Sequence, residues 1–141
     1  MIEFIKEILN NSTIQILCVV IVLDLIFGIL RAIKEKSINS TIGIDGMIRK
    51  TGMLITIMVL SFIDIIVHID FIGFIPEQVK QLLNLKVVGI ADVFSILFII
   101  FEVLSVFKNM ILCKMPIPYK LQKLLETVMK EFTGEIKKEE K

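Results

Sequence analysis

Residues 87–109, VVGIADVFSILFIIFEVLSVFKN, form an apolar run long enough to cross a lipid bilayer, yet polar side chains interrupt it at regular intervals. The spacing is three or four residues throughout the series Ser95, Phe98, Glu102, Ser105 and Asn109, so an α-helix would carry all five on one face. The opposite face consists of Ile, Leu, Val and Phe. Such a helix is expected to turn its polar face toward other helices or toward water.

The composition of the chain is that of a membrane protein. Hydrophobic residues make up 55% of the 141 residues, and the mean hydropathy is +0.84, which is high for a soluble domain. A soluble helical bundle is disfavoured because a soluble helix carries a charged face, whereas residues 8–23 contain no charged residue. The sequence therefore predicts an all-α integral membrane protein with three transmembrane helices, at about residues 12–33, 47–68 and 87–109.

Basic residues alternate along the chain in a way that predicts its orientation. Around the most apolar blocks, residues 13–30, 52–67 and 87–107, one Lys precedes the first block, five Lys and Arg lie between the first and second, two lie between the second and third, and eight follow the third. Because positive charge marks the cytoplasmic side, this pattern predicts an N-terminus outside and a C-terminus inside. The basic residues expected to set this topology are Arg31, Lys34, Lys36, Arg49 and Lys50.

The connections between the spans are expected to be a loop and a short helix. Residues 37–46, SINSTIGIDG, are polar and rich in turn-forming residues. They predict a loop in which Asp45 caps a second helix that opens with Arg49 and Lys50. Between the second and third spans, residues 77–85 are expected to form a short interfacial helix on the outer face.

The ends of the membrane domain also carry helix signals. Asn11, Ser12 and Thr13 are candidate caps for the first helix, and Pro116 and Pro118 are expected to stop the third. The membrane domain therefore covers residues 1–118. Residues 119–141 carry an apolar stripe opposed by charged residues, which predicts an amphipathic cytoplasmic helix that either lies on the membrane or pairs with other copies.

The first two spans carry polar or small residues on one face, as the third does. Asp24, Gly28 and Ala32 share a face of the first span, and Ser61 and Asp64 share a face of the second. A lone carboxylate is costly in lipid and usually faces a partner or water. The residues expected to form a seam between subunits, or a pore wall, are Asp24, Gly28, Ala32, Ser61, Asp64, Ser95, Glu102, Ser105 and Asn109.

The sequence does not favour catalysis, a cofactor or a metal site. His68 is the single histidine and has no second strong metal ligand nearby, and residues 37–46 have neither the Walker nor the dinucleotide glycine spacing. Cys18 and Cys113 show no metal or redox spacing and are interpreted as structural. We therefore expect no enzyme activity, no cofactor, no metal and no nucleic-acid partner.

Several segments resemble the holins of toxin secretion and phage lysis, and among them the holin-like proteins encoded beside large clostridial toxins. The similarity is carried by DLIFGILRAIK at residues 24–34, INSTIGIDGMIRK at 38–50, Asp64, and GIADVFSILFIIFEVLSVFKN with MPIP within 89–118. The resemblance implies a non-enzymatic protein of the bacterial cytoplasmic membrane. Such a protein assembles with copies of itself into lesions through which a toxin or a cell-wall-lytic endolysin leaves the cell.

The residues themselves leave other functions open. A small ion-coupled transporter or channel subunit would also place lone acids in its spans. A structural membrane adaptor could dock partners through its amphipathic tail. The sequence does not separate toxin export from phage lysis, and it leaves open whether Glu102 faces a lumen or a neighbouring helix.

Overall fold

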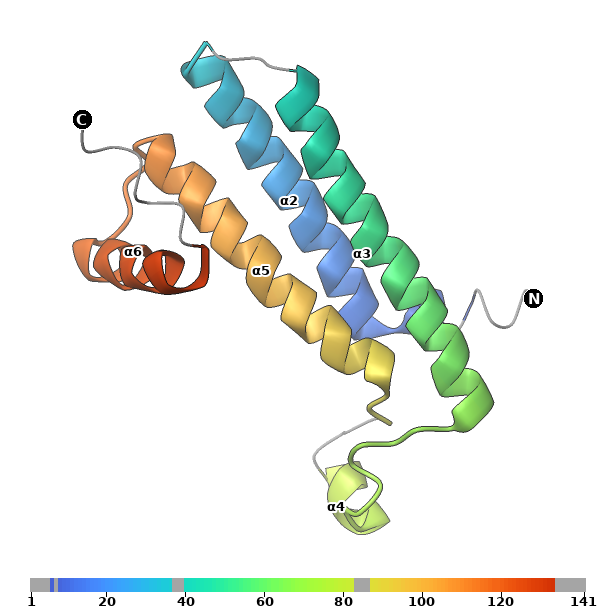
Figure 1. Cartoon of the computed structure of the whole chain (residues 1–141). Helices are drawn as coiled ribbons and strands as arrows, with labels where there is room; N and C mark the ends of the chain where they lie inside the picture. Colours follow the sequence, from blue (N-terminus) through green and yellow to red (C-terminus); the bar gives the residue numbers. More distant parts are fainter. Residues whose placement is uncertain (1–5, 7, 37–39, 83–86, 134–141) are drawn as a thin grey trace. The chain divides into compact units, whose positions relative to one another are not determined.

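The computed structural model describes residues 6, 8–36, 40–82 and 87–133 of the chain, and the regular structure of these residues is helical (Figure 1). The helices are α2 (Ser12–Lys34), α3 (Ser40–Val67), α4 (Glu77–Leu82), α5 (Ile90–Leu112) and α6 (Tyr119–Thr133). Stretches long and apolar enough to cross a membrane lie at Ser12–Lys34, Gly43–Val67 and Ile90–Leu112. The predicted class, an all-α protein with three candidate transmembrane helices, is confirmed.

The chain divides into two compact units, and α2 and α5 contribute to both. Unit 1 contains Met1–Val19 and Ser40–Ile99, which include the first part of α2, all of α3 and α4, and the first part of α5. Unit 2 contains Val20–Asn39 and Ile100–Lys141, which include the second parts of α2 and α5 together with α6. Both units are therefore built on the two helices α2 and α5.

In unit 1 the start of α2, the end of α3 and the start of α5 lie together. The side-chain amide of Asn11, which precedes α2, donates a hydrogen bond to Asp92 in the first turn of α5 at 2.8 Å. In the last turn of α3, Asp64 accepts a hydrogen bond from the backbone N–H of Ile90 at 2.9 Å. Because α3 ends where α2 and α5 begin, the three helices alternate in direction, as three successive membrane crossings require.

Of the three candidate caps, Asn11 is the one that caps the start of α2. The side-chain oxygen of Asn11 accepts hydrogen bonds from the backbone N–H groups of Thr13 and Ile14, at 2.9 and 3.1 Å. This is the usual chemistry of an N-cap asparagine, which satisfies donors that have no partner within the helix.

Each of the three long helices is followed by a residue with a positive φ. Lys36, His68 and Lys114 have φ values of 50°, 55° and 52°, in the left-handed region that glycine adopts most easily. At the end of α5, the N–H groups of Lys114 and of the next residue bond the carbonyls of Ile111 and Met110, which is a Schellman motif. The third helix therefore stops before the prolines of the MPIP segment, as predicted.

The segment predicted as a loop between the first two spans is helical from Ser40 onward, so that prediction is wrong. Asp45 lies in the second turn of α3 and does not cap the helix. The Asn, Ser and Gly residues signal a turn, but Ile44 and Met47 continue the apolar spacing of a helix, and this spacing prevails. At Gly46 an added side chain would meet no atom within 4 Å, so the helix there is unobstructed.

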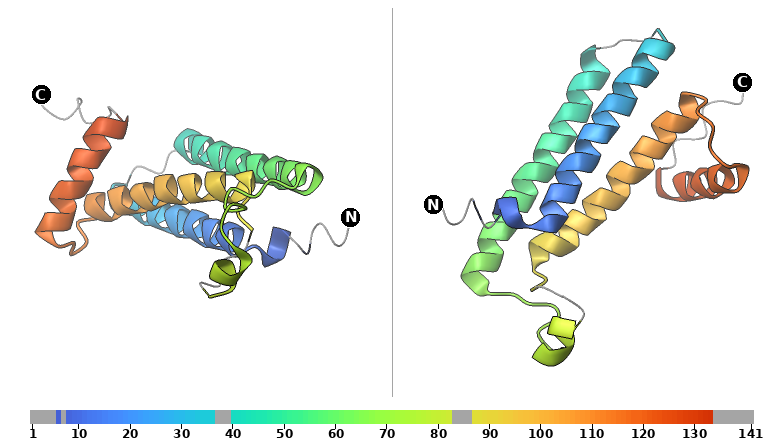
Figure 2. Two further views of the ribbon diagram at one scale, coloured as in Figure 1. Left: turned by 90° about the horizontal axis from the view of Figure 1, so that it is seen from below. Right: turned by 180° about the vertical axis from the view of Figure 1, so that it is seen from behind.

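Two further helices complete the units. α4 begins at Glu77 as predicted and ends at Leu82, and the remainder of the predicted helix lies outside the described residues. In unit 2, α6 runs across α5 rather than along it (Figure 2). Leu125 on α6 is 5% exposed, so one side of the amphipathic helix packs within the unit.

Candidate functional site

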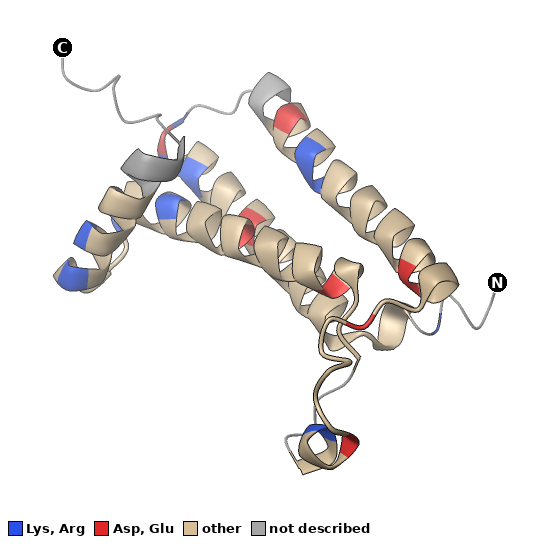
Figure 3. Cartoon of the chain, turned by 60° about the horizontal axis from the view of Figure 1, so that its bottom comes forward, with Lys and Arg blue, Asp and Glu red and all other residues tan. Residues whose placement is uncertain are grey.

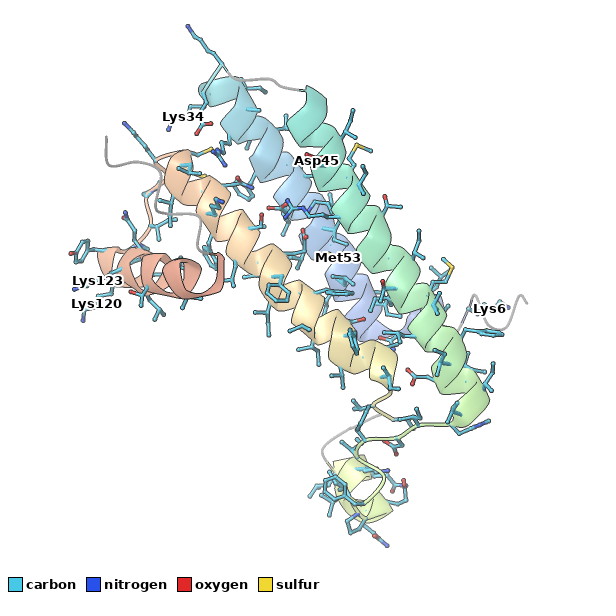
Figure 4. The ribbon with its side chains drawn as sticks, viewed as in Figure 1. Lys6, Lys34, Asp45, Met53, Lys120 and Lys123 are labelled. Atoms are coloured by element: carbon cyan, nitrogen blue, oxygen red, sulfur yellow. The ribbon has the colours of Figure 1, made fainter. Side chains whose placement is uncertain are left out.

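Polar side chains are buried in this chain, while many large apolar side chains are exposed. In the described residues, buried polar or charged side chains, each at most 8% exposed, are found at Asp24, Lys50, Ser61, Lys80, Ser95, Glu102 and Asn109. By contrast, Ile29 and Ile100 are 60% and 51% exposed, and side chains of this kind project along the outer sides of the long helices (Figure 4). This arrangement is the reverse of that in a water-soluble protein and fits helices surrounded by lipid.

In unit 2 the polar faces of the first and third spans meet. The side-chain amide of Asn109 donates a hydrogen bond to Asp24 at 3.1 Å, and both side chains are buried. Gly28, one turn further along α2, lies beside them, because a Cβ there would be 3.9 Å from the amide nitrogen of Asn109. Ala32 and Ser105 are half-buried. The sequence analysis placed these residues in a seam between subunits or in a pore wall, and in the single chain Asp24, Gly28 and Asn109 lie beside one another.

In unit 1 the two predicted serines are buried without a partner. Ser61 and Ser95 are 7% and 0% exposed. Neither hydroxyl has a hydrogen-bond partner among the residues that the structure describes. A buried hydroxyl without a partner destabilises a fold by about 1–3 kcal/mol. Contact with water, or with a polar group of another helix, would therefore lower the free energy of both groups.

Asp64 has a role that its place in the second span did not predict. Its two carboxylate oxygens accept hydrogen bonds from the backbone N–H groups of Ile90 and Ala91, at 2.9 and 2.8 Å. These residues begin α5, and their N–H groups have no partner within the helix. Gly89 precedes them at the cap position and has no side chain with which to cap. Asp64 at the end of α3 therefore supplies the capping carboxylate that Gly89 cannot provide.

Four successive backbone N–H groups at the start of α5 donate to three aspartates. The N–H of Val88 donates to Asp70 at 3.3 Å, that of Gly89 donates to Asp92 at 3.1 Å, and Asp64 accepts the next two. We call Asp64, Asp70 and Asp92 the aspartate cap. Their negative charge also opposes the positive end of the helix dipole. The aspartate cap thus satisfies donors that could not stay unpaired near hydrocarbon.

The aspartate cap requires glycine at position 89. A Cβ on Gly89 would lie within 3.0 Å of all three heavy atoms of the Asp64 carboxylate group. The N–H of Gly89 donates to one oxygen of Asp92, and the other oxygen of Asp92 accepts from Asn11. Since Asn11 also caps α2, hydrogen bonds join the starts of α2 and α5 to the end of α3.

An ion pair outside the spans holds Asp70 of the aspartate cap in place. Lys80 on α4 donates a hydrogen bond to Asp70 at 3.0 Å and lies 3.3 Å from Glu77. The hydrogen bond from Lys80 lowers the pKa of Asp70, although desolvation opposes this shift. The same hydrogen bond raises the pKa of Lys80. Both groups are therefore charged at neutral pH.

The basic residues near the ends of α2 and α3 lie in several environments. Arg31 pairs with Glu35 at 3.0 Å, and Lys34 donates to a backbone carbonyl just beyond α5. Lys36 and Arg49 are exposed. In unit 2, the hydrogen bond from Lys34 to the backbone carbonyl of Cys113 therefore joins the end of α2 to the end of α5.

Lys50 does not stand at the start of the second helix, contrary to the prediction. The second span, predicted at residues 47–68, begins at Gly43 in a helix that starts at Ser40. Lys50 consequently lies about 15 Å along α3, and it is only 7% exposed. The early start of the helix, which the turn-forming residues obscured, accounts for the difference.

Reasoning from the sequence missed several residues of the aspartate cap. The side chains of Asp70 and Asp92, and the absence of one at Gly89, received no role. One signal was present, because Asp92 follows Gly89 by three residues, the spacing of a capping box. No local signal links Asp70 to Val88, since 18 residues separate them.

Comparison with known proteins relates the whole of this arrangement to one family. The bacteriophage holin family matches residues 4–130 of the chain. The chain is similar to the holin-like protein TcdE of Clostridioides difficile, with 40% identity over 135 residues that cover 96% of this chain and 80% of that protein. No solved structure matches the chain. The matched range includes the three long helices and the aspartate cap.

Gly89→Ala is expected to destabilise the chain by about 1–3 kcal/mol, because the new Cβ displaces the Asp64 carboxylate from α5. Amide hydrogen exchange at Ile90 and Ala91 should accelerate as well. The matched control is Gly46→Ala, which fills open space inside α3 and should stabilise the chain by about 1 kcal/mol. Unfolding by sodium dodecyl sulfate in mixed micelles would measure both. Equal stabilities for the two variants would contradict the cap.

The ion pair between Asp70 and Lys80 predicts a specific pH dependence. Because the pKa of folded Asp70 is lowered, its stabilisation is present above the usual carboxyl range and is lost as pH falls through the lowered value. Because the pKa of Lys80 is raised, its stabilisation is present below the usual value of 10.5 and is lost only above the raised one.

Lys80→Gln should therefore reduce stability across the neutral range and raise the pKa of Asp70 toward its ordinary value of 3.8. Thermal unfolding in micelles as a function of pH would measure the first effect, and NMR titration of the Asp70 carboxyl carbon the second. Glu77→Gln is the control, since Glu77 does not contact Asp70 in the described contacts and should change the titration of Asp70 less. An unchanged titration in Lys80→Gln would contradict the assigned cause.

Proposed function

This chain belongs to the bacteriophage holin family, and we propose that it assembles with copies of itself into lesions that release a toxin from the cell. It is a pore-forming, multi-pass protein of the bacterial cytoplasmic membrane, and three of its helices are long enough to cross that membrane. The resemblance to holin-like proteins encoded beside large clostridial toxins supports a toxin as cargo. A cell-wall-lytic enzyme is the alternative cargo. The proposal includes no catalytic step and no cofactor.

The observation that carries the proposal is the burial of polar groups from the spans inside a single chain. Asp24, Glu102 and Asn109 are at most 8% exposed, while apolar side chains such as Ile29 and Ile100 are at least half exposed. A single chain can therefore accumulate in lipid without presenting a carboxylate to hydrocarbon. The same polar groups are available for other partners once the chains are crowded.

We infer that assembly turns these polar faces toward neighbouring copies or toward a water-filled lumen. The hydroxyls of Ser61 and Ser95 would gain partners there. The hydrogen bond between Asp24 and Asn109 could be exchanged for an equivalent bond to another copy at little net cost. Asp64 differs from these residues because its carboxylate already accepts hydrogen bonds from the start of α5. We therefore assign Asp64 to holding the end of α3 against the start of α5 during assembly.

The proposed seam therefore omits Asp64 from the set that the sequence suggested. The small side chains among its members would let neighbouring backbones approach closely. Its members are Asp24, Gly28, Ala32, Ser61, Ser95, Glu102, Ser105 and Asn109.

The proposed orientation places the aspartate cap on the outer side and α6 on the cytoplasmic side. Positive charge near the ends of spans favours the cytoplasmic side. Arg31, Lys34 and Lys36 lie at the end of α2 in unit 2. At the start of α5, by contrast, the described basic residue Lys80 is paired with Asp70, so it adds little net positive charge. These observations support an N-terminus outside and a C-terminus inside.

Expression of the chain alone in a bacterium is expected to release a cytoplasmic reporter protein of tens of kilodaltons. Glu102→Gln should still insert into the membrane but release much less reporter, because a lumen that loses this charge retains water poorly. Glu35→Gln is the matched control, since it removes an exposed carboxylate paired with Arg31, and its release should equal that of the natural chain. Saturable flux of a small ion without reporter release would indicate a transporter or channel subunit instead.

Cysteine labelling should distinguish the proposed seam from the lipid-facing side. Ser95→Cys, Glu102→Cys and Ser105→Cys, in a background without the native cysteines, are expected to react with a water-soluble thiol reagent only after assembly. Ile96→Cys and Ile100→Cys are the controls, because these positions are 50% and 51% exposed and should remain in lipid. Equal labelling of both faces in the assembled state would rule out the seam.

A further inference from the structure

The helix that follows the last span has the geometry of a membrane-surface element. Six residues separate the end of α5 from the start of α6, so the start of α6 lies within about 25 Å of the end of α5. Within unit 2, α6 runs across α5 in both views of Figure 2. A helix that crosses a membrane-spanning helix so close to its end lies along the membrane surface.

One flank of α6 is exposed and combines apolar with basic residues. Tyr119 is 75% exposed and Leu124 is 59% exposed, although Leu125 beside them is buried. Lys120 and Lys123 are exposed on the same part of the helix and project away from α5 (Figure 4). We call Tyr119, Lys120, Lys123 and Leu124 the α6 flank. Apolar side chains framed by lysines are the composition of a helix that settles into the headgroup layer of a bilayer.

Among the described side chains of unit 2, exposed basic residues outnumber exposed acidic ones. The described side chains of unit 2 include one exposed acidic residue, Glu35, which pairs with Arg31. They also include five exposed basic residues, and Figure 3 shows basic residues on α6 and toward the adjoining ends of α2 and α5. These exposed basic residues are Lys34, Lys36, Lys114, Lys120 and Lys123.

We propose that the α6 flank docks onto anionic lipid headgroups of the leaflet in which α2 and α5 end. Leu124 and Tyr119 enter the boundary between headgroups and acyl chains, while Lys120 and Lys123 contact lipid phosphates. Charge complementarity favours this occupant over a second copy of α6, because two copies would bring the same lysines together. The inference goes beyond the proposed function, since it concerns the class of lipid that the chain recognises and not the cargo.

The absence of tryptophan from the sequence permits a clean test. Leu124→Trp introduces a single fluorophore into the α6 flank of the full chain. The protein is reconstituted into phosphatidylcholine vesicles with or without phosphatidylglycerol, each containing lipid brominated near the headgroup end of its acyl chains. We expect a blue-shifted emission and strong bromine quenching with phosphatidylglycerol, and both should weaken as salt is added. Tyr119→Trp serves as a second reporter should Leu124→Trp fail to fold.

Two controls separate recognition of anionic lipid from general insertion. Lys120→Gln combined with Lys123→Gln should abolish the difference between the two lipid compositions, whereas Lys6→Gln should preserve it. Ile29→Trp, a 60% exposed position on α2, should be quenched by bromine within the acyl chains in both compositions.

Three outcomes would overturn the proposal. The first is equal quenching with and without phosphatidylglycerol. The second is quenching that does not respond to salt or to the two lysine substitutions. The third is a reporter signal that follows protein concentration instead of lipid composition, which would identify a second copy as the occupant. None of these outcomes depends on release of cargo, so the proposed function is tested separately.

Discussion

Polar groups cannot be left without partners in hydrocarbon, and this constraint shapes both units of the structure. Within each helix the backbone N–H and C=O groups bond to one another, except at the helix ends. The start of α5 shows how the unpaired N–H groups of one end find acceptors. Three carboxylates from three different parts of the chain accept its four successive N–H groups. The constraint explains why position 89 is a glycine, which leaves room for the Asp64 carboxylate. It also explains why Asn11 both caps α2 and bonds to Asp92 at the start of α5.

Regular patterns in the sequence predicted the parts of the structure that local rules control. Apolar length predicted the three spans, and the three- and four-residue spacing predicted that Asp24, Gly28 and Asn109 lie on faces that meet another helix. Prediction failed at residues 40–46, where turn-forming residues outweighed the helical spacing of Ile44 and Met47 in the interpretation. The sequence also did not reveal the capping role of Asp64, because the residues that it caps lie 26 and 27 residues further along the chain.

Membership of the holin family and the burial pattern support the same function by independent routes. The family relates the chain to pore formation, and the burial pattern gives a physical reason for the assembly of several copies that we propose. A single chain buries Asp24, Glu102 and Asn109 and leaves Ile and Val side chains exposed on its outer sides, so these three polar groups do not face hydrocarbon. The hydroxyls of Ser61 and Ser95 have no described partner in the single chain, and a partner from another copy would lower the free energy of both groups.

The residues that follow α2 and α5 illustrate a compromise between backbone conformation and charge. Lys36 and Lys114 both adopt positive φ values, where glycine would avoid about 1–2 kcal/mol of conformational cost. A glycine there would stop the helix equally well but would delete a positive charge at the end of a span, where it favours the helix dipole and the cytoplasmic side. Replacing either lysine with glycine would therefore raise the stability of the helix end but weaken the charge signal that orients the chain in the membrane.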